Sequence, residues 1–549
     1  GISCSYPVTV FPSSSRPSLT HPGIRPPLHD PSPKLLSRQT TTSHPAKRAK
    51  MSVETLPLWI DGEEKPSTST KLLDVKDPAT QDVLCRVPCA TQAEMEAIVQ
   101  SAIAAAKKWR ETPVQQRCRV LIKLHSLLVA NQGRIADVIV AENGKTKADA
   151  MGDVFRGIEV VEHAIAMPSM TMGESMEQIS TNMDTHTMRQ PLGVVAGIAP
   201  FNFPAMIVLW MLPIAIGTGN AFILKPSERV PGAARIIAQL TAEAGLPKGV
   251  FSLLHGGKEA VDFLCTHAAI RAVSFVGSGH VGKIVHSLAS AAGKRVQCNM
   301  GAKNHAVVLP DCNAEQTLNG IIGAAFGAAG QRCMAISVVV LVGSASALLA
   351  PLVEKARALK VGRGADETTE VGPMISPEAK TRALKIVFDS VASGAVLALD
   401  GTGVVVPGYE QGNFIGPVVL TGVTTSMQCY TEEIFAPVLC IMTVATLDEA
   451  ISLVNANSMG NGVALFTASG GAARKFSHEI EVGQIGINVP VPVPLPFFSW
   501  SSSKGSLLGE HHFYGKSAVD FYTQIKTVVS RWEHRDFDSD AGSVNFSGR

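Results

Sequence analysis

The sequence predicts an α/β protein with two regions of parallel βαβ units. From residue 193 onward, short apolar strands alternate with helical segments, and this alternation is typical of a parallel sheet covered by helices. In the first region, strands are expected at residues 193–199, 221–224, 251–254 and 272–276. In the second, from about 306 to 496, buried strands are expected at 306–309 and 338–342. A chain of 549 residues is also too long for one hydrophobic core.

The segment before residue 193 is expected to be mainly helical. Asp61-Gly62 is typical of a hairpin turn. Thr91 is the expected N-cap of a helix within residues 90–109, because apolar residues follow it at helical spacing. Two further helices are expected at residues 115–130 and 152–166.

Two apolar stretches need separate interpretation. Residues 204–224 carry no charge, which raises the question of a membrane span. Because two prolines and a Gly-Thr-Gly-Asn turn interrupt this stretch, a buried helix, turn and strand fits better. Residues 489–496 alternate proline with apolar residues and are expected to be extended without a central place in a sheet.

The first 50 residues differ in composition from the rest. They are rich in proline, serine and basic side chains, and Asp30 is their one acidic residue. This composition cannot bury a core and resembles an organelle transit peptide, which favours a mitochondrial protein. The alternative is a disordered extension, with Met51 as a possible start and a cytoplasmic protein. The tail at residues 533–549 is expected to be frayed.

Composition limits the kinds of partner. Hydrophobic residues make up 46% of the chain, charged residues 17%, and the net charge is +2, so nothing favours nucleic acid. We expect small molecules and further copies of the chain as partners. Among the ten cysteines, the closest pair, Cys85 and Cys89, has a spacing that matches no common metal signature. Reduced thiols and no metal are therefore expected.

A candidate dinucleotide site follows the predicted strand at 272–276. Gly277-Ser-Gly-His-Val-Gly282 has the GxGxxG pattern, which brings phosphate close to backbone at a helix N-terminus. The usual ribose-binding acid downstream is missing. Lys225 and Glu228 are candidate replacements, since Glu228 would accept from a ribose 2′-hydroxyl and repel a 2′-phosphate, favouring NAD. The alternative is a solvated ion pair at a helix start.

Cys333 lies beside Arg332 in a run of small, uncharged residues. Burying a guanidinium without a partner is costly, so something negative is expected opposite Arg332.

Five motifs share the order and spacing of one known family. They are Pro-Phe-Asn-Phe-Pro at 200–204, Lys-Pro-Ser-Glu at 225–228, Phe-Val-Gly-Ser at 275–278, Gly-Gln-Arg-Cys at 330–333 and Glu-Glu-Ile-Phe-Ala-Pro-Val at 432–438. Over roughly residues 58–532, the chain resembles the aldehyde dehydrogenase superfamily. The resemblance implies an aldehyde dehydrogenase fold, with a Rossmann-like NAD-binding domain at 51–170 and 192–300 and an α/β catalytic domain at 301–510. A small β arm at 171–191 and 517–532 would join subunits into a homo-oligomer, as a dimer of dimers.

The resemblance also implies residue roles. Cys333 resembles the catalytic nucleophile, and Asn202 resembles the amide that forms the oxyanion hole with a backbone N–H. Glu433 and Phe435 resemble the pair that holds the nicotinamide ribose and ring. The cofactor-binding residues expected in all are Ala199, Phe201, Lys225, Glu228, Gly277, Ser278, Gly282, Glu433 and Phe435.

One position departs from the hydrolytic members, which have a glutamate where this sequence has Asn299. A neutral amide cannot take a proton from water, and a general base contributes roughly 10²–10⁴ in rate. A thiol is already a few per cent ionised near neutral pH and needs less help. We therefore expect coenzyme A to accept the acyl group. The alternative is a catalytically inactive NAD-binding relative.

The match continues around Asn299, in Gly301-Ala-Lys-Asn-His305 and in Phe521-Tyr-Thr-Gln-Ile-Lys-Thr527. These residues resemble the CoA-acylating methylmalonate-semialdehyde dehydrogenases. That resemblance implies oxidation and decarboxylation of methylmalonate or malonate semialdehyde, with NAD and coenzyme A, through a thioacyl-enzyme.

The carboxylate of such a substrate needs fixed cations. Arg332 is one candidate, and the resemblance nominates Arg156 as the second. The alternative for Arg332 is a structural salt bridge to a protein carboxylate. The alternative for the protein is a hydrolytic NAD aldehyde dehydrogenase of broad specificity.

Overall fold

The computed structural model describes residues 53–532. The expected extension at residues 1–50 and the expected tail at 533–549 both lie outside this range.

The first region forms an eight-stranded sheet in the order β2-β1-β9-β8-β7-β10-β11-β21. Its strands are β1 (Leu58–Ile60), β2 (Glu63–Lys65), β7 (Val194–Ile198), β8 (Ala221–Lys225), β9 (Phe251–Leu253), β10 (Ile270–Val276), β11 (Arg295–Asn299) and β21 (Leu507–Leu508). The run from β9 to β11 is parallel, which confirms the four predicted strands. The predicted turn joins β1 to β2, with φ of 56° at Asp61 and 71° at Gly62.

Helices cover this sheet. They are α1 (Gln92–Trp109), α2 (Val114–Asn143), α3 (Lys147–Ile165), α4 (Met167–Met170), α5 (Met206–Gly217), α6 (Gly232–Glu243), α7 (Lys258–Thr266) and α8 (Gly279–Ala291). Thr91 caps α1 as predicted and forms a capping box with Glu94. Helix α2 runs beyond the predicted end at residue 130, because Ile135 and Ile139 in its second half are buried.

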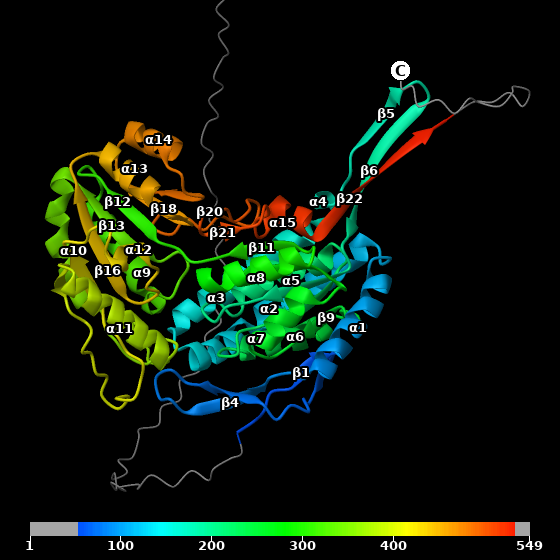
Figure 1. The fold of residues 1–549 in the computed structure, drawn as a ribbon, viewed down its shortest axis with the longest axis horizontal. Coiled ribbons are helices and arrows are strands. Elements are labelled where there is room, and N and C mark those ends of the chain that lie inside the picture. The colour runs from blue at the N-terminus through cyan, green and yellow to red at the C-terminus, as the bar shows by residue number, and fades with distance from the viewer. Residues whose placement is uncertain (1–52, 533–549) are drawn as a thin grey trace, which may run out of the picture. The chain divides into compact units, whose positions relative to one another are not determined.

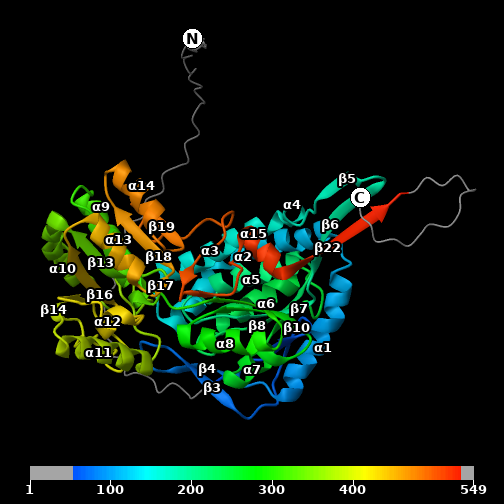
Figure 2. The same cartoon turned by 45° about the horizontal axis from the view of Figure 1, so that its top comes forward.

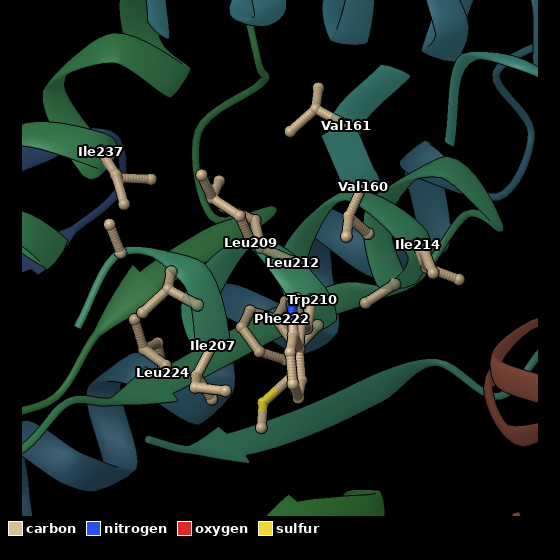
Figure 3. Close-up of a cluster of buried hydrophobic side chains, with 14 of the residues drawn as sticks. Val160, Val161, Ile207, Leu209, Trp210, Leu212, Ile214, Phe222, Leu224 and Ile237 are labelled. Atoms are coloured by element: carbon tan, nitrogen blue, oxygen red, sulfur yellow. The ribbon is translucent and has the colours of Figure 1, made fainter. Parts of the chain in front are cut away.

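The uncharged stretch at 204–224 lies in the core, as predicted. Every residue of α5 is buried, and β8 follows it after a turn. Figure 3 shows Leu209, Trp210 and Leu212 of α5 among side chains of neighbouring elements, including Val160 and Phe222. Within residues 53–532, no helix is both long and apolar enough to cross a membrane.

The second region forms a seven-stranded sheet in the order β14-β15-β16-β13-β12-β18-β19. Its strands are β12 (Asn304–Val308), β13 (Ile336–Val342), β14 (Val396–Leu399), β15 (Val418–Thr421), β16 (Val438–Val444), β18 (Gly462–Phe466) and β19 (Gln484–Ile487). All neighbours are parallel except β14 and β15. The predicted strands at 306–309 and 338–342 are confirmed as β12 and β13.

Helices surround the second sheet (Figures 1 and 2). They are α9 (Ala314–Phe326), α10 (Leu349–Arg357), α11 (Pro377–Ala392), α12 (Gln428–Thr431), α13 (Leu447–Ala456) and α14 (Gly470–Glu479). The proline-rich stretch at 489–496 contains no strand, as predicted.

A third sheet joins distant parts of the chain. β5 (Ser175–Ser180), β6 (Met183–Pro191) and β22 (Thr523–Arg531) lie side by side in Figures 1 and 2. β22 pairs with β6 along its whole length, so both expected arm segments contribute strands. The expected arm nevertheless differs at residues 517–522, which belong to helix α15 (Gly515–Tyr522) and pack on α5. The apolar side chains of α15, including Val519 and Phe521, are buried in the first core, and this favours a helix there.

Two short pairs complete the fold. β3 (Leu72–Lys76) pairs with β4 (Val83–Pro88), and β17 (Met459–Gly460) pairs with β20 (Ser503–Lys504). β21 comes from the range assigned to the catalytic domain but pairs with β11 of the first sheet. The segment around residues 500–508 therefore connects the two large sheets.

Candidate active site

Cys333 lies in the loop between a 3₁₀ turn (Gly327–Gly330) and β13. The chain enters this loop through three successive left-handed residues, with φ of 50°, 54° and 69° at Ala328, Ala329 and Gly330. A Cβ at Gly330 would come within 2.1 Å of the Ala436 carbonyl oxygen, so only glycine fits. Left-handed alanines are strained and persist only where the surrounding structure fixes them.

Two buried amides hold the loop at the cysteine itself. The Cys333 carbonyl oxygen accepts from Asn304 Nδ2 at 2.8 Å and from Asn461 Nδ2 at 2.9 Å. Asn304 also donates to the Ala335 carbonyl oxygen at 2.9 Å. The backbone on either side of the thiol is therefore fixed.

Burial, followed by the negative charge of Glu433, raises the pKa of the Cys333 thiol to about 12, and the backbone N–H groups of Cys333 and Met334 oppose this shift. The nine described cysteines are all free. Among residues 53–532, no group of three His, Cys, Asp or Glu side chains could hold a metal ion.

Asn202 approaches the same loop from the first sheet. It follows β7, and its Nδ2 donates to the Gln331 carbonyl oxygen at 3.1 Å, two residues before Cys333. Its own carbonyl oxygen accepts from Lys145 Nζ at 2.5 Å. The amide expected in the oxyanion hole thus lies against the nucleophile loop.

A buried ion pair fixes the Asn202 loop. Lys145 Nζ lies 3.1 Å from Asp153 Oδ2, with side-chain exposures of 1% and 0%. Asp153 also accepts from the Met206 backbone N–H at 2.7 Å. Burial raises the pKa of Asp153, and the charge of Lys145 opposes this shift. Sequence reasoning missed both residues, because neither belongs to a motif.

The structure shows a protein carboxylate opposite Arg332, which was the alternative to a substrate carboxylate. Its Nη2 forms an ion pair with Asp149 Oδ1, and its Nη1 donates to the Gly323 carbonyl oxygen at 3.1 Å. Asp149 also accepts from the Ala328 backbone N–H at 3.1 Å. The alternative of a protein salt bridge is therefore present, and it anchors the turn that leads to Cys333.

Arg156 lies on α3 with its side chain 45% exposed, and its Nη1 donates to Glu159 Oε2 at 2.8 Å. Burial raises the pKa of Tyr514, and the positive charge of Arg156 opposes this shift. The Tyr514 ring packs edge-on against Trp210 with centroids 5.1 Å apart. Tyr514 has a φ of 43°, unusual for a bulky residue. Tyr514 is a further residue near the site that the sequence did not single out.

The GxGxxG segment lies where the pattern requires, between β10 and α8. Ser278 caps α8, and its Oγ accepts from the Val281 backbone N–H at 3.4 Å. A Cβ at Gly282 would lie 2.6 Å from the Met300 side chain, and one at Gly277 would lie 2.5 Å from the Phe275 ring. Any larger residue at either position would force these side chains to move.

Lys225 and Glu228 lie at the end of β8. Lys225 Nζ is 3.0 Å from Glu228 Oε2, with side-chain exposures of 6% and 38%. The ion pair between Lys225 and Glu228, which was the alternative to a ribose-binding role, is present, but its lysine is buried and not solvated. Burial acts to raise the pKa of Glu228, but the charge and hydrogen bond of Lys225, the Glu228 backbone N–H and the charge of Arg229 together lower it. Ala199 is adjacent, and its backbone N–H donates to the Lys225 carbonyl oxygen at 3.0 Å.

Glu433 and Phe435 lie in the loop between α12 and β16 of the second region, and both contact residues that follow strands of the first sheet. Glu433 Oε1 accepts from the Ala302 backbone N–H at 2.9 Å, and burial raises the pKa of Glu433. Phe435, with a φ of 59°, packs edge-on against Phe201 with centroids 5.9 Å apart. The predicted cofactor residues of both regions are thus brought together. A half-buried carboxylate and closely packed glycines at a helix N-terminus fit a dinucleotide.

Asn299 ends β11 and is completely buried. Its side-chain oxygen accepts from Trp500 Nε1 at 3.1 Å, and its nitrogen donates to Ser502 Oγ at 3.0 Å and to the Ser506 carbonyl oxygen at 3.2 Å. The sequence identified Asn299 but not these partners, which are about 200 residues away along the chain. A run of serines carries no signal for a buried role.

Comparisons with known proteins agree with this geometry. The model of the aldehyde dehydrogenase family matches residues 65–528. An Arabidopsis thaliana protein named methylmalonate-semialdehyde dehydrogenase, acylating, mitochondrial, is 54% identical over 478 residues, covering 87% of this chain and 79% of that protein. A Rattus norvegicus protein named methylmalonate-semialdehyde/malonate-semialdehyde dehydrogenase, acylating, mitochondrial, is 50% identical over 504 residues, covering 92% and 94%.

Solved structures are similar as well. The crystal structure of a methylmalonate-semialdehyde dehydrogenase from Sinorhizobium meliloti, described as putative and complexed with NAD, aligns with a TM-score of 0.87 at 42% identity. The alignment covers 89% of this chain and 100% of that one. The chain belongs to the aldehyde dehydrogenase family.

Proposed function

We propose that the protein converts methylmalonate semialdehyde, coenzyme A and NAD to propionyl-CoA, carbon dioxide and NADH. Malonate semialdehyde would give acetyl-CoA in the same way. The observation that carries this proposal is Asn299, a buried neutral amide where hydrolytic relatives have a glutamate. Relatives at 50–54% identity bear the name of this acylating activity.

Each step has residues suited to it. Cys333 attacks the aldehyde carbon, and Asn202 with the backbone N–H of Cys333 would stabilise the oxyanion. NAD, when bound by the residues around Glu433 and Gly282, supplies the hydride acceptor. The carboxylate of the thioacyl-enzyme then leaves as carbon dioxide, while the same oxyanion donors stabilise the enolate oxygen. The thiol of coenzyme A takes the acyl group and frees Cys333.

Arg156 and Arg332 are proposed to orient the substrate carboxylate. Arg332 has five N–H donors in its guanidinium, and its contacts to Asp149 and Gly323 leave others for a substrate. The loss of such an orienting cation would affect methylmalonate semialdehyde more than propanal, which has no carboxylate.

The assembly and location are part of the same proposal. The arm strands expose apolar side chains, among them Met176, Ile525 and Val529, which favours pairing between subunits into a dimer of dimers. A mitochondrial location is proposed because the relatives are named as mitochondrial.

A product assay tests the function. The purified protein is incubated with methylmalonate semialdehyde and NAD, with and without coenzyme A, and propionyl-CoA is quantified by mass spectrometry. The expected result is stoichiometric propionyl-CoA and NADH, with a single-turnover burst when coenzyme A is omitted. Full NADH turnover without coenzyme A would instead identify a hydrolytic enzyme.

A further inference from the structure

A chain of buried hydrogen bonds links Asn299 to the nucleophile loop. Ser502 Oγ lies 2.6 Å from Asn461 Oδ1 and 3.0 Å from the Asn299 amide. Asn461 Nδ2 in turn donates to the Cys333 carbonyl oxygen at 2.9 Å. Asn299 is 0% exposed, Asn461 1%, Trp500 1% and Ser502 6%.

The direction of every proton in this chain is determined. Asn461 uses its nitrogen for Cys333, so its oxygen can only accept, and the single proton of Ser502 must go to it. Ser502 therefore accepts from Asn299, whose nitrogen also donates to the Ser506 carbonyl oxygen. The Asn299 oxygen is left to accept from Trp500 Nε1 at 3.1 Å, and the same N–H is shared with Ser502 Oγ at 3.2 Å. Position 299 must supply two donors and one acceptor, which an amide provides and an ionised carboxylate does not.

We propose that Ser502 is a positioning residue that determines which molecule accepts the acyl group. It satisfies the side-chain amide of Asn299 and the amide oxygen of Asn461, so neither of these groups is left free to hold a water molecule near the thioester. Deacylation is then left to a thiol, which needs no base in this position. This inference rests on the proposed function and extends it.

The test measures how the acyl-enzyme partitions between water and thiol. Each variant is acylated with methylmalonate semialdehyde and NAD, and the Cys333 adduct is followed by intact-protein mass spectrometry, first without and then with coenzyme A. Ser502→Ala removes the hydroxyl and leaves Asn299 and Asn461 unsatisfied. The rate of hydrolysis relative to thiol transfer is expected to rise about two- to tenfold, the loss of one net hydrogen bond. A general weakening of the fold would slow both rates and leave their ratio unchanged.

Ser503→Ala is the matched control. The Ser503 hydroxyl donates to the carbonyl oxygens of Gly460 at 3.0 Å and Glu481 at 3.1 Å, outside the chain of bonds, so its ratio should equal that of the wild type. Trp500→Phe provides a second variant that keeps an aromatic side chain but removes the N–H shared by Asn299 and Ser502, and a smaller rise is expected.

Equal ratios in Ser502→Ala, Ser503→Ala and wild type would overturn the proposal. If Ser502→Ala does not fold, an unchanged ratio in Trp500→Phe overturns it. Failure of the wild type to form propionyl-CoA would instead refute the proposed function, so the two failures are distinguishable.

Discussion

Replacing Asp149 with alanine tests what holds Arg332 beside the nucleophile. The two side chains are 22% and 21% exposed, so their ion pair is partly screened. A hydrogen bond to a charged group contributes about 1.5–3 kcal/mol, and we reduce this to about 1–2 kcal/mol for the exposed fraction. Asp149 also accepts from the Ala328 N–H, so its loss should loosen the turn before Cys333.

The assay is a double-mutant cycle of Asp149→Ala and Arg332→Leu. For each variant, the free energy of unfolding is measured by urea denaturation, and kcat/KM is measured for propanal and for methylmalonate semialdehyde. The double variant is expected to be more stable than the sum of single losses predicts, by about 1–2 kcal/mol. Asp149→Ala should lower kcat/KM for propanal as well, by roughly three- to thirtyfold, since 1.4 kcal/mol is a factor of ten. Arg332→Leu should lower kcat/KM for methylmalonate semialdehyde further. If the single losses of stability add without coupling, the ion pair does not stabilise the loop and this reasoning is wrong.

Three further predictions follow from the site. Lys145→Met leaves the Asp153 carboxyl buried without its partner and should lower the free energy of unfolding by about 3–5 kcal/mol, measured by urea denaturation. Gly282→Ala places a Cβ 2.6 Å from the Met300 side chain and should weaken NAD binding in a fluorescence titration, whereas adding Met300→Ala should recover much of the loss. Because the pKa of Cys333 is raised to about 12 without cofactor and the thiolate is the reactive form, alkylation by iodoacetamide should accelerate about tenfold per pH unit between pH 7 and 10. A plateau near pH 8 would contradict this.

The parts of the fold that could be predicted are those with a local cause. β7, β8 and β10 are short apolar strands bounded by turns, and Thr91 with Glu94 is a capping box readable in four residues. The end of α2 could not be predicted in this way. Gly133 in its middle resembles a helix stop, since glycine costs about 1 kcal/mol in a helix. Burial of Ile135 and Ile139 outweighs that cost, and burial depends on the rest of the fold.

The same distinction applies to the site. Motifs identified Cys333, Asn202 and the cofactor residues, because backbone constraints and chemistry concentrate in short segments there. Arg332 was identified, but its partner Asp149 is 183 residues away, and nothing local to either residue indicates the pair. The sequence therefore allowed a protein salt bridge for Arg332 but could not name the carboxylate that forms it.

The hydrogen bonds around Asn299 also explain why the acyl acceptor is a property of several residues rather than one. Decarboxylation and transfer both require that the thioester outlives contact with water, and a general base nearby would shorten that life by roughly 10²–10⁴. Asn299 removes this base, because a neutral amide cannot take a proton from water. In addition, Trp500, Ser502 and Ser506 satisfy the donors and the acceptor of the Asn299 amide, so this amide offers none to a water molecule. A glutamate at position 299 would face the Ser506 carbonyl oxygen and the lone pairs of Ser502, neither of which can donate to it. A carboxylate there could act as a base only if these partners changed with it.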